Sequence, residues 1–470
     1  MATPPADRGP VSGKTRMTYL EFLDNSPMTG FLWLLLFGLC LAQLLDGFDF
    51  LSTSFAMPGM IREFHLNPPQ AGLIASVTNI GLMLGAIFFP MFCDGVGRKP
   101  VFQMVLLTYA VGTFLSAVAP SYNVLLVARF VAGVGIGAQL PIVMAILAEF
   151  SPARLRHIFV PVGPIFYSFG WIIAALLSIW LIPWLGWRSI YWVGIIPAFL
   201  SLFVRYFLPE SVRFLLAHGK VEEAGRITAD LARRAKMEHL ELVPPPQSQG
   251  ATQMTFREQF GLLGAYWGRT LMLAFFFFCS FVQTFGLNAW LPTIFIRQGF
   301  RLTTSFSYTL MIFSVTPLSH VIAMWLQNRI DRKWALFIMT FGGTVFFVLF
   351  GLSFQYHWPI WVLVGSQVMQ TLLAQGVVAI LFTLSAELYP TPVRTLGMGL
   401  VNGVGRLGAV LGPFLLGVFL HFGTQISDII YFYAAPLLVA AIVALFAIKV
   451  DPRRRSLDQI GAAAGAGKAS

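Results

Sequence analysis

Charged residues are scarce in this sequence. They make up 11% of the 470 residues, whereas an ordinary soluble domain carries about a quarter. Hydrophobic residues make up 57%, which is more apolar surface than a soluble protein of this length could shield from water. The lipid bilayer is therefore the expected solvent, and the chain length is better interpreted as a number of membrane spans than as a number of soluble domains.

Cysteine is also rare, and catalytic signatures are missing. Cys40, Cys93 and Cys279 are an odd set without paired spacing, so we interpret them as packing residues and expect neither a disulfide framework nor a metal site. The sequence has no nucleophile elbow, no HExxH pattern and no GxxxxGK[ST] loop for ATP. We therefore expect no enzyme, no cofactor and no ATP-driven transport by this chain alone.

Apolar runs long enough to cross a bilayer, about 20 residues each, recur along the chain. The first six runs cover residues 31–55, 70–92, 101–118, 124–147, 159–183 and 189–208. The other six cover residues 270–295, 306–326, 334–354, 360–384, 396–422 and 429–448. The sequence thus predicts an all-α membrane protein with twelve transmembrane helices in two sets of six.

The polar segments divide the chain into five parts. We expect a tail at 1–28, six-helix bundles at 29–208 and 269–450, a central loop at 209–268 and a second tail at 451–470. The first tail is rich in proline and glycine and predicts no fixed structure. The first apolar run lacks a cleavage site and predicts an uncleaved span. In the central loop, 221–237 predicts a helix and 242–250 a flexible linker.

The formal net charge of +11 comes from basic residues that are distributed unevenly between the loops. Loops expected on one side contain Arg98, Lys99, Arg154, Arg156, Arg329, Arg332, Lys333 and Arg453 to Arg455. By the positive-inside rule, that side and both termini are expected in the cytoplasm, with the chain crossing the inner membrane many times. We expect the lipid bilayer and no nucleic acid as a partner, and a monomer.

A loop after the fourth span of each set is duplicated. Residues 149–156 and 387–394 both fit E-x-x-P-x-x-x-R, so a carboxylate and a guanidinium can form charge-assisted hydrogen bonds at the helix ends. A weaker pair, 94–99 and 328–333, follows the second span of each set; the alternative is two unrelated basic loops. Duplicated halves predict alternating access to a substrate held between them near the midplane.

These loops resemble the major facilitator superfamily, as do residues 129–137 and 209–215. Residues 94–99 resemble its signature loop, with departures at Pro90 and Gly95. The resemblance covers almost the whole chain and implies two pseudo-symmetric six-helix bundles. It also implies a cytoplasmic gate whose ion pairs latch the halves. The gate residues would be Asp94, Arg98, Glu149, Arg156, Glu387 and Arg394.

Two acidic residues, Asp46 and Asp49, interrupt the first apolar run. They share a helix face, because they are three residues apart. A carboxylate in a bilayer is costly unless it is paired, protonated or hydrated, and two close carboxylates repel, which favours binding a proton at one of them. Both are candidates for proton coupling; the alternative is that both lie at the outer water interface.

Residues 46–49 resemble the D-G-F-D pattern of the aromatic acid:H⁺ symporters, in which these aspartates are implicated in transport. Residues 167–175 and 403–408 look more like the nicotinate-type permeases. Both subfamilies handle small carboxylated aromatic solutes. The resemblance therefore implies an organic acid and protons as the transported partners.

Two arginines lie inside predicted spans. Arg406 needs an anionic partner, which would be the substrate carboxylate or, as the alternatives, Asp46 or Asp49 in a salt bridge, or the membrane interface. Arg129, with Gly133 and Gly137, is assigned to helix packing or coupling. Further candidates for substrate contact are Asn79, Gln139, Tyr167, Trp171, Gln283, Asn288, Trp290, Gln370, Gln375 and Asn402.

The sequence as a whole favours a proton-coupled carrier for a small aromatic or related carboxylate. A sugar or polyol carrier and a drug exporter are rivals, since E-x-x-P-x-x-x-R loops also occur in sugar carriers. Arg406 favours an anion over a neutral sugar. A solute sensor would need an output domain, and a membrane enzyme would need a catalytic set.

Overall fold

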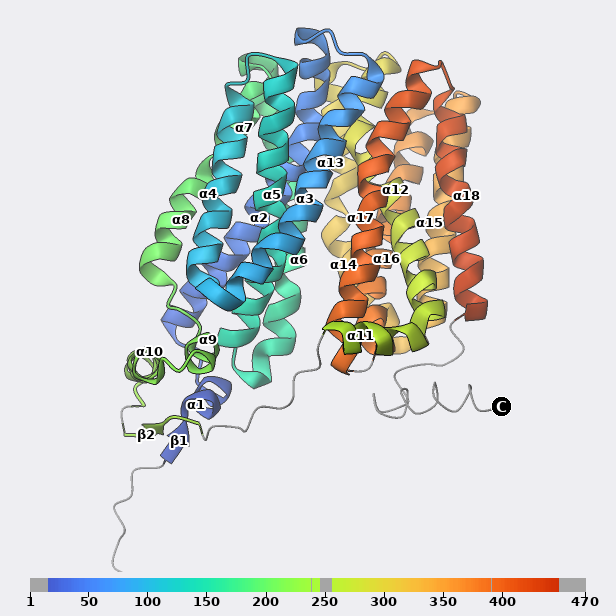
Figure 1. Cartoon of the computed structure of the whole chain (residues 1–470). Coiled ribbons are helices and arrows are strands. Elements are labelled where there is room, and N and C mark those ends of the chain that lie inside the picture. The colour runs from blue at the N-terminus through green and yellow to red at the C-terminus, as the bar shows by residue number, and fades with distance from the viewer. Residues whose placement is uncertain (1–15, 238, 246–255, 390, 448–470) are drawn as a thin grey trace, which may run out of the picture.

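The computed structural model describes residues 16–237, 239–245, 256–389 and 391–447. Within this part of the chain, twelve helical segments are long and apolar enough to cross a membrane, as the sequence predicts. The helices of the first half lie on one side in Figure 1 (blue to green), and those of the second half on the other (yellow to red).

The spans of the first half are α2 (Gly30–Glu63), α3 (Pro68–Val96), α4 (Arg98–Ala117), α5 (Tyr122–Phe150), α6 (Ala153–Leu185), and α7 (Arg188–Val193) with α8 (Ile196–Phe207). Those of the second half are α12 (Trp267–Arg297), α13 (Leu302–Ser314) with α14 (Thr316–Arg329), α15 (Arg332–Gln355), α16 (Ile360–Leu388), α17 (Thr391–His421) and α18 (Ile426–Ala447). The first span is longer than predicted, because its helix continues through Pro58 to Glu63.

The sixth and eighth spans are each divided into two helices, where the sequence predicts one continuous run. In both spans a proline lies in the first turn of the second helix, Pro197 in α8 and Pro317 in α14. Proline has no N–H for the preceding turn, and its ring fits a first helical turn well. The apolar run therefore stays long enough to span, but the helix restarts within it.

Short elements gather at the end of the bundle where α2 and α12 begin, which we call the near end (Figure 1). They are β1 (Arg16–Thr18), α1 (Tyr19–Asn25), α9 (Val212–Ala217), α10 (Val221–Arg234), β2 (Glu241–Val243), α11 (Phe256–Leu263) and a 3-10 turn (Gly264–Tyr266). The opposite end, with the turns 64–67 and 298–301, is the far end.

Part of the expected tail and linker is ordered, which corrects the sequence prediction. β1 pairs in parallel with β2, and the Arg16 guanidinium bonds to the Glu241 carboxylate at 2.9 Å. A capping box between Thr18 and Glu21 starts α1, and Phe22 is buried beneath it. The prediction failed here because each strand has only three residues and its partner lies more than 200 residues away, outside any local window. Residues 1–15 of the tail and 246–250 of the linker lie outside the described residues.

The two halves share a hydrophobic core only toward the far end. That core joins buried residues of α2 and α6, such as Phe55 and Ile182, to Trp290 of α12 and Phe306 of α13. Toward the near end each half has its own core, one containing Phe102 and the other Phe277, without buried residues from the other half. The described structure is therefore sealed at the far end and divided at the near end.

Helices α3 and α5 approach each other so closely that glycine is required at their crossing. A side-chain carbon at Gly133 would overlap the Thr78 carbonyl oxygen, and one at Gly137 would overlap that of Leu82. These glycines let the backbones touch and gain dispersion contacts along α3 and α5, which is how helices associate in lipid. The crossing fixes α5, and with it Arg129, against the rest of the first half.

Candidate functional site

Asp49 and Arg129 form a fully buried ion pair inside the first half. The Arg129 Nη2 lies 2.8 Å from the Asp49 Oδ2, and the Thr113 hydroxyl donates to Oδ1 at 3.2 Å. The guanidinium lies over the Tyr191 ring, 5.1 Å from its centroid. An ion in an apolar interior needs a partner of opposite charge. Asp49 and Arg129 supply this partner to each other.

Asp46 lies on the same face of α2 but has no such partner. It is 1% exposed, and its Oδ1 accepts no hydrogen bond within the described residues. No cation of the described part lies within ion-pair distance of it. Asp46 and Asp49 are thus both buried in the protein, not at a water interface, and they occupy different electrostatic environments.

Arg406 lies on α17 and faces α6 of the other half. It is half-buried, its Nε makes no hydrogen bond, and no described carboxylate lies within ion-pair distance. The Tyr167 hydroxyl is close enough to interact electrostatically with both Arg406 and Asp46. The salt bridge from Arg406 to Asp49 that the sequence left open is not formed, because Arg129 occupies that carboxylate.

Aromatic rings surround this region where the two halves meet. Phe50 stacks on Trp171 with centroids 6.0 Å apart, and meets Phe285 of the other half edge-on at 5.3 Å. Trp171 in turn meets Phe313 at 5.2 Å and Tyr167 at 5.9 Å. The Trp171 Nε1 is buried beside the Tyr167 hydroxyl. Flat apolar walls, the Tyr167 hydroxyl and the Arg406 guanidinium therefore lie together.

The remaining candidates fall into three groups. Asn79 and Asn288 line a small cavity between the halves together with Phe50 and Phe285. Gln283 and Gln370 line a separate cavity inside the second half, among threonines of α15. Trp290 is a packing residue, since its Nε1 donates to the Pro413 carbonyl at 3.0 Å.

Several amides inside the bundle have no hydrogen-bond partner among the described residues. Both polar atoms of Gln139 and the Oδ1 of Asn402 are unsatisfied, as is the Nδ2 of Asn288. Gln375 is buried on α16. Unsatisfied amides are costly in an apolar interior unless water or a ligand completes them, so these atoms are available to hydrogen-bond water or a bound solute.

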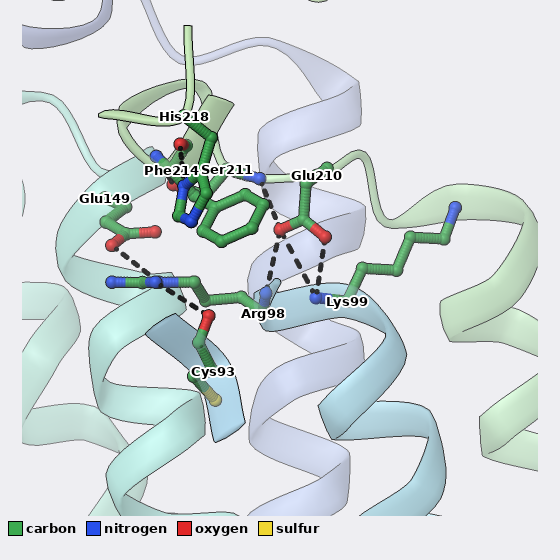
Figure 2. Close-up of polar contacts among 8 residues, drawn as sticks. All are labelled: Cys93, Arg98, Lys99, Glu149, Glu210, Ser211, Phe214 and His218. Carbon is green, nitrogen blue, oxygen red and sulfur yellow. Dashed lines mark hydrogen bonds and ion pairs between the residues drawn. The ribbon is translucent and has the colours of Figure 1, made fainter. Parts of the chain in front are cut away.

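The signature loop at the near end is an ion-pair and capping cluster (Figure 2). The Arg98 Nε lies 3.2 Å from the Glu149 Oε1, and its Nη1 donates to the Cys93 carbonyl at 3.2 Å. Glu210 accepts the backbone N–H of Arg98 at 2.9 Å and so caps α4. Gly97 precedes this cap with a φ of +112°, and a side chain there would also collide with Glu210.

The second half repeats this cluster. Arg332 forms two bonds to Glu387, at 3.1 and 2.9 Å, and its Nη1 donates to the Gln327 carbonyl. In both halves, the arginine of the loop after the second span thus bonds the glutamate after the fourth span and a carbonyl five residues before itself. The two copies of the sequence motif therefore share one geometry.

These pairs differ from the predicted gate. Glu149 and Glu387 each pair with an arginine of their own half, so the pairs hold helices within a half instead of latching the halves together. The side chains of Asp94, Arg156 and Arg394 lie outside the described residues. The predicted gate did not include Arg332 or Glu210, although the second copy of the loop, residues 328–333, was a usable signal for Arg332.

The loss of one near-end ion pair should measurably lower the stability of the protein. We expect Glu387→Gln to lower unfolding free energy by roughly 2–3 kcal/mol, because it removes a charged acceptor from nearly buried Arg332. Asp230→Asn is the matched control: it breaks a half-exposed pair with Arg234 and should cost less than about 0.5 kcal/mol. Thermal unfolding in detergent, followed by tryptophan fluorescence, compares them. Equal shifts would contradict a structural role for the Arg332–Glu387 pair.

Residues 37–463 match the model of the family described as "Sugar (and other) transporter". The chain belongs to this family of the major facilitator superfamily. It is therefore a multi-pass membrane transporter and not an enzyme, in agreement with the sequence analysis.

Curated members of this family that resemble the chain come from bacteria. The niacin transporter NiaP of Acinetobacter baylyi is 28% identical over 95% of this chain and 100% of its own length. The benzoate transport protein of the same organism is 28% identical, covering 84% and 85%. A gallate transporter of Pseudomonas putida is 26% identical, covering 95% and 96%.

Solved structures share the transporter fold. The inward-open xylose transporter XylE from E. coli superposes with a TM-score of 0.72 at 16% identity, covering 92% of this chain and 99% of XylE. A bacterial homologue of the lysosomal transporter Spinster gives 0.69 at 15% identity, covering 92% and 99%. At these identities the likeness establishes the fold alone.

Proposed function

We propose that this transporter takes up a small aromatic carboxylate together with protons by alternating access. The observation that carries the proposal is Arg406, a guanidinium without an anion among the described residues, beside a cluster of aromatic rings. A planar guanidinium binds a carboxylate with two parallel hydrogen bonds, and apolar walls suit a ring. The relatives named for niacin, benzoate and gallate support this substrate class.

The position of the cluster suits a transport site. Phe50 of α2 and Trp171 of α6 belong to one half, and Phe285 and Arg406 to the other. A solute between them would contact both halves, so its binding and release would be linked to their relative movement. The far end is sealed and the near end is divided; with both termini in the cytoplasm, this arrangement would face inward.

The aspartates supply the proposed link to protons. Asp46 and the substrate carboxylate are both anions that the Tyr167 and Arg406 donors could stabilise. Protonation of Asp46 would leave these donors to the substrate, and release of the proton would favour its departure. The inward proton gradient would thereby drive uptake.

Uptake by purified protein in lipid vesicles tests this function. With an acidic exterior, we expect uphill accumulation of labelled nicotinate or benzoate and none of labelled glucose, because only the acids satisfy Arg406. Protein-free vesicles control for acid that crosses the lipid unaided. Glucose uptake without acid uptake would support the sugar-carrier alternative, and solute binding without any flux would support a sensor.

A further inference from the structure

A small cavity where the two halves meet contains polar atoms that have no hydrogen-bond partner among the described residues. We propose that this cavity receives a ring hydroxyl of an aromatic acid, and that Asn79 is the residue that selects solutes carrying one. The proposal deepens the proposed function and rests on it, since it names a feature of the solute beyond its carboxylate.

The cavity lies between α2, α3 and α12, and therefore between the two halves. Its apolar lining includes Phe50 and Phe285, the rings that meet edge-on at 5.3 Å. Its polar lining consists of three hydroxyl side chains and two amides, which are Thr53, Ser54, Thr78, Asn79 and Asn288. The space suits a group about the size of a water molecule, and the described residues that line it are all uncharged.

The hydroxyl groups of the cavity already have partners. The Ser54 hydroxyl donates to the Asn288 carbonyl at 2.6 Å, and the Thr78 hydroxyl donates to a carbonyl of its own helix at 2.9 Å. The Thr53 oxygen accepts from the Tyr191 hydroxyl at 3.3 Å. The two amides are therefore the polar groups of the cavity that remain available to a solute.

The Asn79 amide has a defined orientation. Its Nδ2 donates to the Ala75 carbonyl at 2.9 Å, so its Oδ1 is the atom without a partner, and the side chain is 2% exposed. From the other half, Asn288 offers a buried Nδ2 without a partner. A hydroxyl group can donate to the first and accept from the second. A ring nitrogen could satisfy only Asn288, and a methyl group could satisfy neither amide.

Asn79 lies at about the same depth in the bundle as Arg406. Helices α3 and α17 run antiparallel and make three close contacts toward the far end, which are Pro68 with Gly417, Gly72 with Pro413, and Ser76 with Val410. Successive contacts are three or four residues apart along each helix, which is about one helical turn. One further turn toward the near end brings Asn79 level with Leu407 and Arg406.

This position lets one solute reach both residues. A solute whose carboxylate binds Arg406 can place its ring against Phe50 and Phe285. Its hydroxyl then reaches the cavity at Asn79. Without a hydroxyl, the Asn79 oxygen stays buried and unpaired, which costs free energy. A site that bonds a hydroxyl therefore rejects an analogue without it more strongly than an apolar pocket rejects a change of size.

Competition against uptake of labelled benzoate into vesicles tests this selection. The competitors are 3-hydroxybenzoate and 4-hydroxybenzoate, and each is compared with the methylbenzoate of the same substitution pattern, which matches the hydroxyl in size. We expect at least one hydroxybenzoate to inhibit at a concentration about tenfold or more below that of its methyl counterpart. Asn79→Leu keeps the side-chain volume, removes the amide and should abolish the difference.

Gln103→Leu is the matched control, because it removes an amide that bonds the Ser201 carbonyl between α4 and α8, away from the cavity. It should keep the preference. The comparison uses two solutes on one variant, so the amount of folded protein cancels. For a variant that transports too slowly, the rise in unfolding temperature on adding each acid gives the same comparison, since a ligand stabilises the state that it binds.

Three results would overturn the assignment of Asn79. They are equal inhibition of the unaltered protein by the hydroxy and methyl acids, a preference that survives in Asn79→Leu, and a preference that is also lost in Gln103→Leu. Failure of the unaltered protein to take up benzoate or nicotinate would instead overturn the proposed function.

Discussion

Replacement of Arg406 by glutamine should raise the KM for nicotinate or benzoate by about a hundredfold or more, because two charge-assisted hydrogen bonds of about 1.5–3 kcal/mol each are lost. Arg406→Lys keeps the charge without the planar fork and should raise KM by about tenfold. Initial uptake rates over a range of substrate concentrations give these values. The neutral amide of nicotinate should bind the protein and the glutamine variant nearly equally, since it presents no carboxylate.

Thermal unfolding separates a substrate role for Arg406 from a structural one. The half-buried guanidinium has no anionic partner among the described residues, so Arg406→Gln removes an uncompensated charge and should leave the unfolding temperature unchanged or higher. Arg297→Gln, at the far end of α12, is the control arginine and should leave KM unaffected. A lower unfolding temperature with an unchanged KM would mean that Arg406 serves packing, and the carboxylate assignment would fail.

A valine at Gly417 should strongly reduce transport by holding the far end open. A side-chain carbon at Gly417 of α17 would overlap the Pro68 carbonyl at the start of α3, and Gly72 of α3 is equally close to Pro413 of α17. The overlapping atoms belong to the backbone, so the halves must separate to accommodate the change. We expect uptake to fall by at least about tenfold, because a state disfavoured by about 1.4 kcal/mol or more is rarely populated.

Gly399→Val is the matched control, because it lies on the same helix and a side chain there meets no neighbouring atom. A Ser54→Cys reporter detects opening, since the Ser54 hydroxyl is buried against the Asn288 carbonyl between the halves. A membrane-impermeant thiol reagent should label the reporter faster with Gly417→Val than with Gly399→Val. Equal labelling and equal uptake in the two backgrounds would show that close approach at the far end is not required for transport.

The fold was largely predictable because lipid imposes simple constraints. Twelve apolar runs and a duplicated loop were enough for the span number and the superfamily resemblance. The predictions that failed concern features that depend on single residues or on partners far away in the sequence. Pro197 and Pro317, for example, divide spans that hydropathy treats as continuous. β1 and β2 pair through backbone groups, and backbone pairing leaves little trace in a three-residue sequence.

The sequence predicted which charged residues form the candidate site, but not which of them pair with each other. Any intramembrane charge requires a partner, which singled out Asp46, Asp49, Arg129 and Arg406. Which arginine meets Asp49 depends on the crossing of α2 and α5, and a linear pattern does not contain that crossing. Phe50, Phe285 and Phe313 were missed because they are three among 45 phenylalanines, most of which face lipid or the core.

The pairing of Arg16 with Glu241 has a consequence for how the protein is made. The two residues are 225 positions apart, and the strand at the start of the chain has no partner until the segment after α10 has been synthesised. The first six spans can enter the membrane earlier, but their support at the near end is completed only once about half of the polypeptide has left the ribosome. The first half can therefore reach its final structure only after the segment that connects it to the second half has been translated.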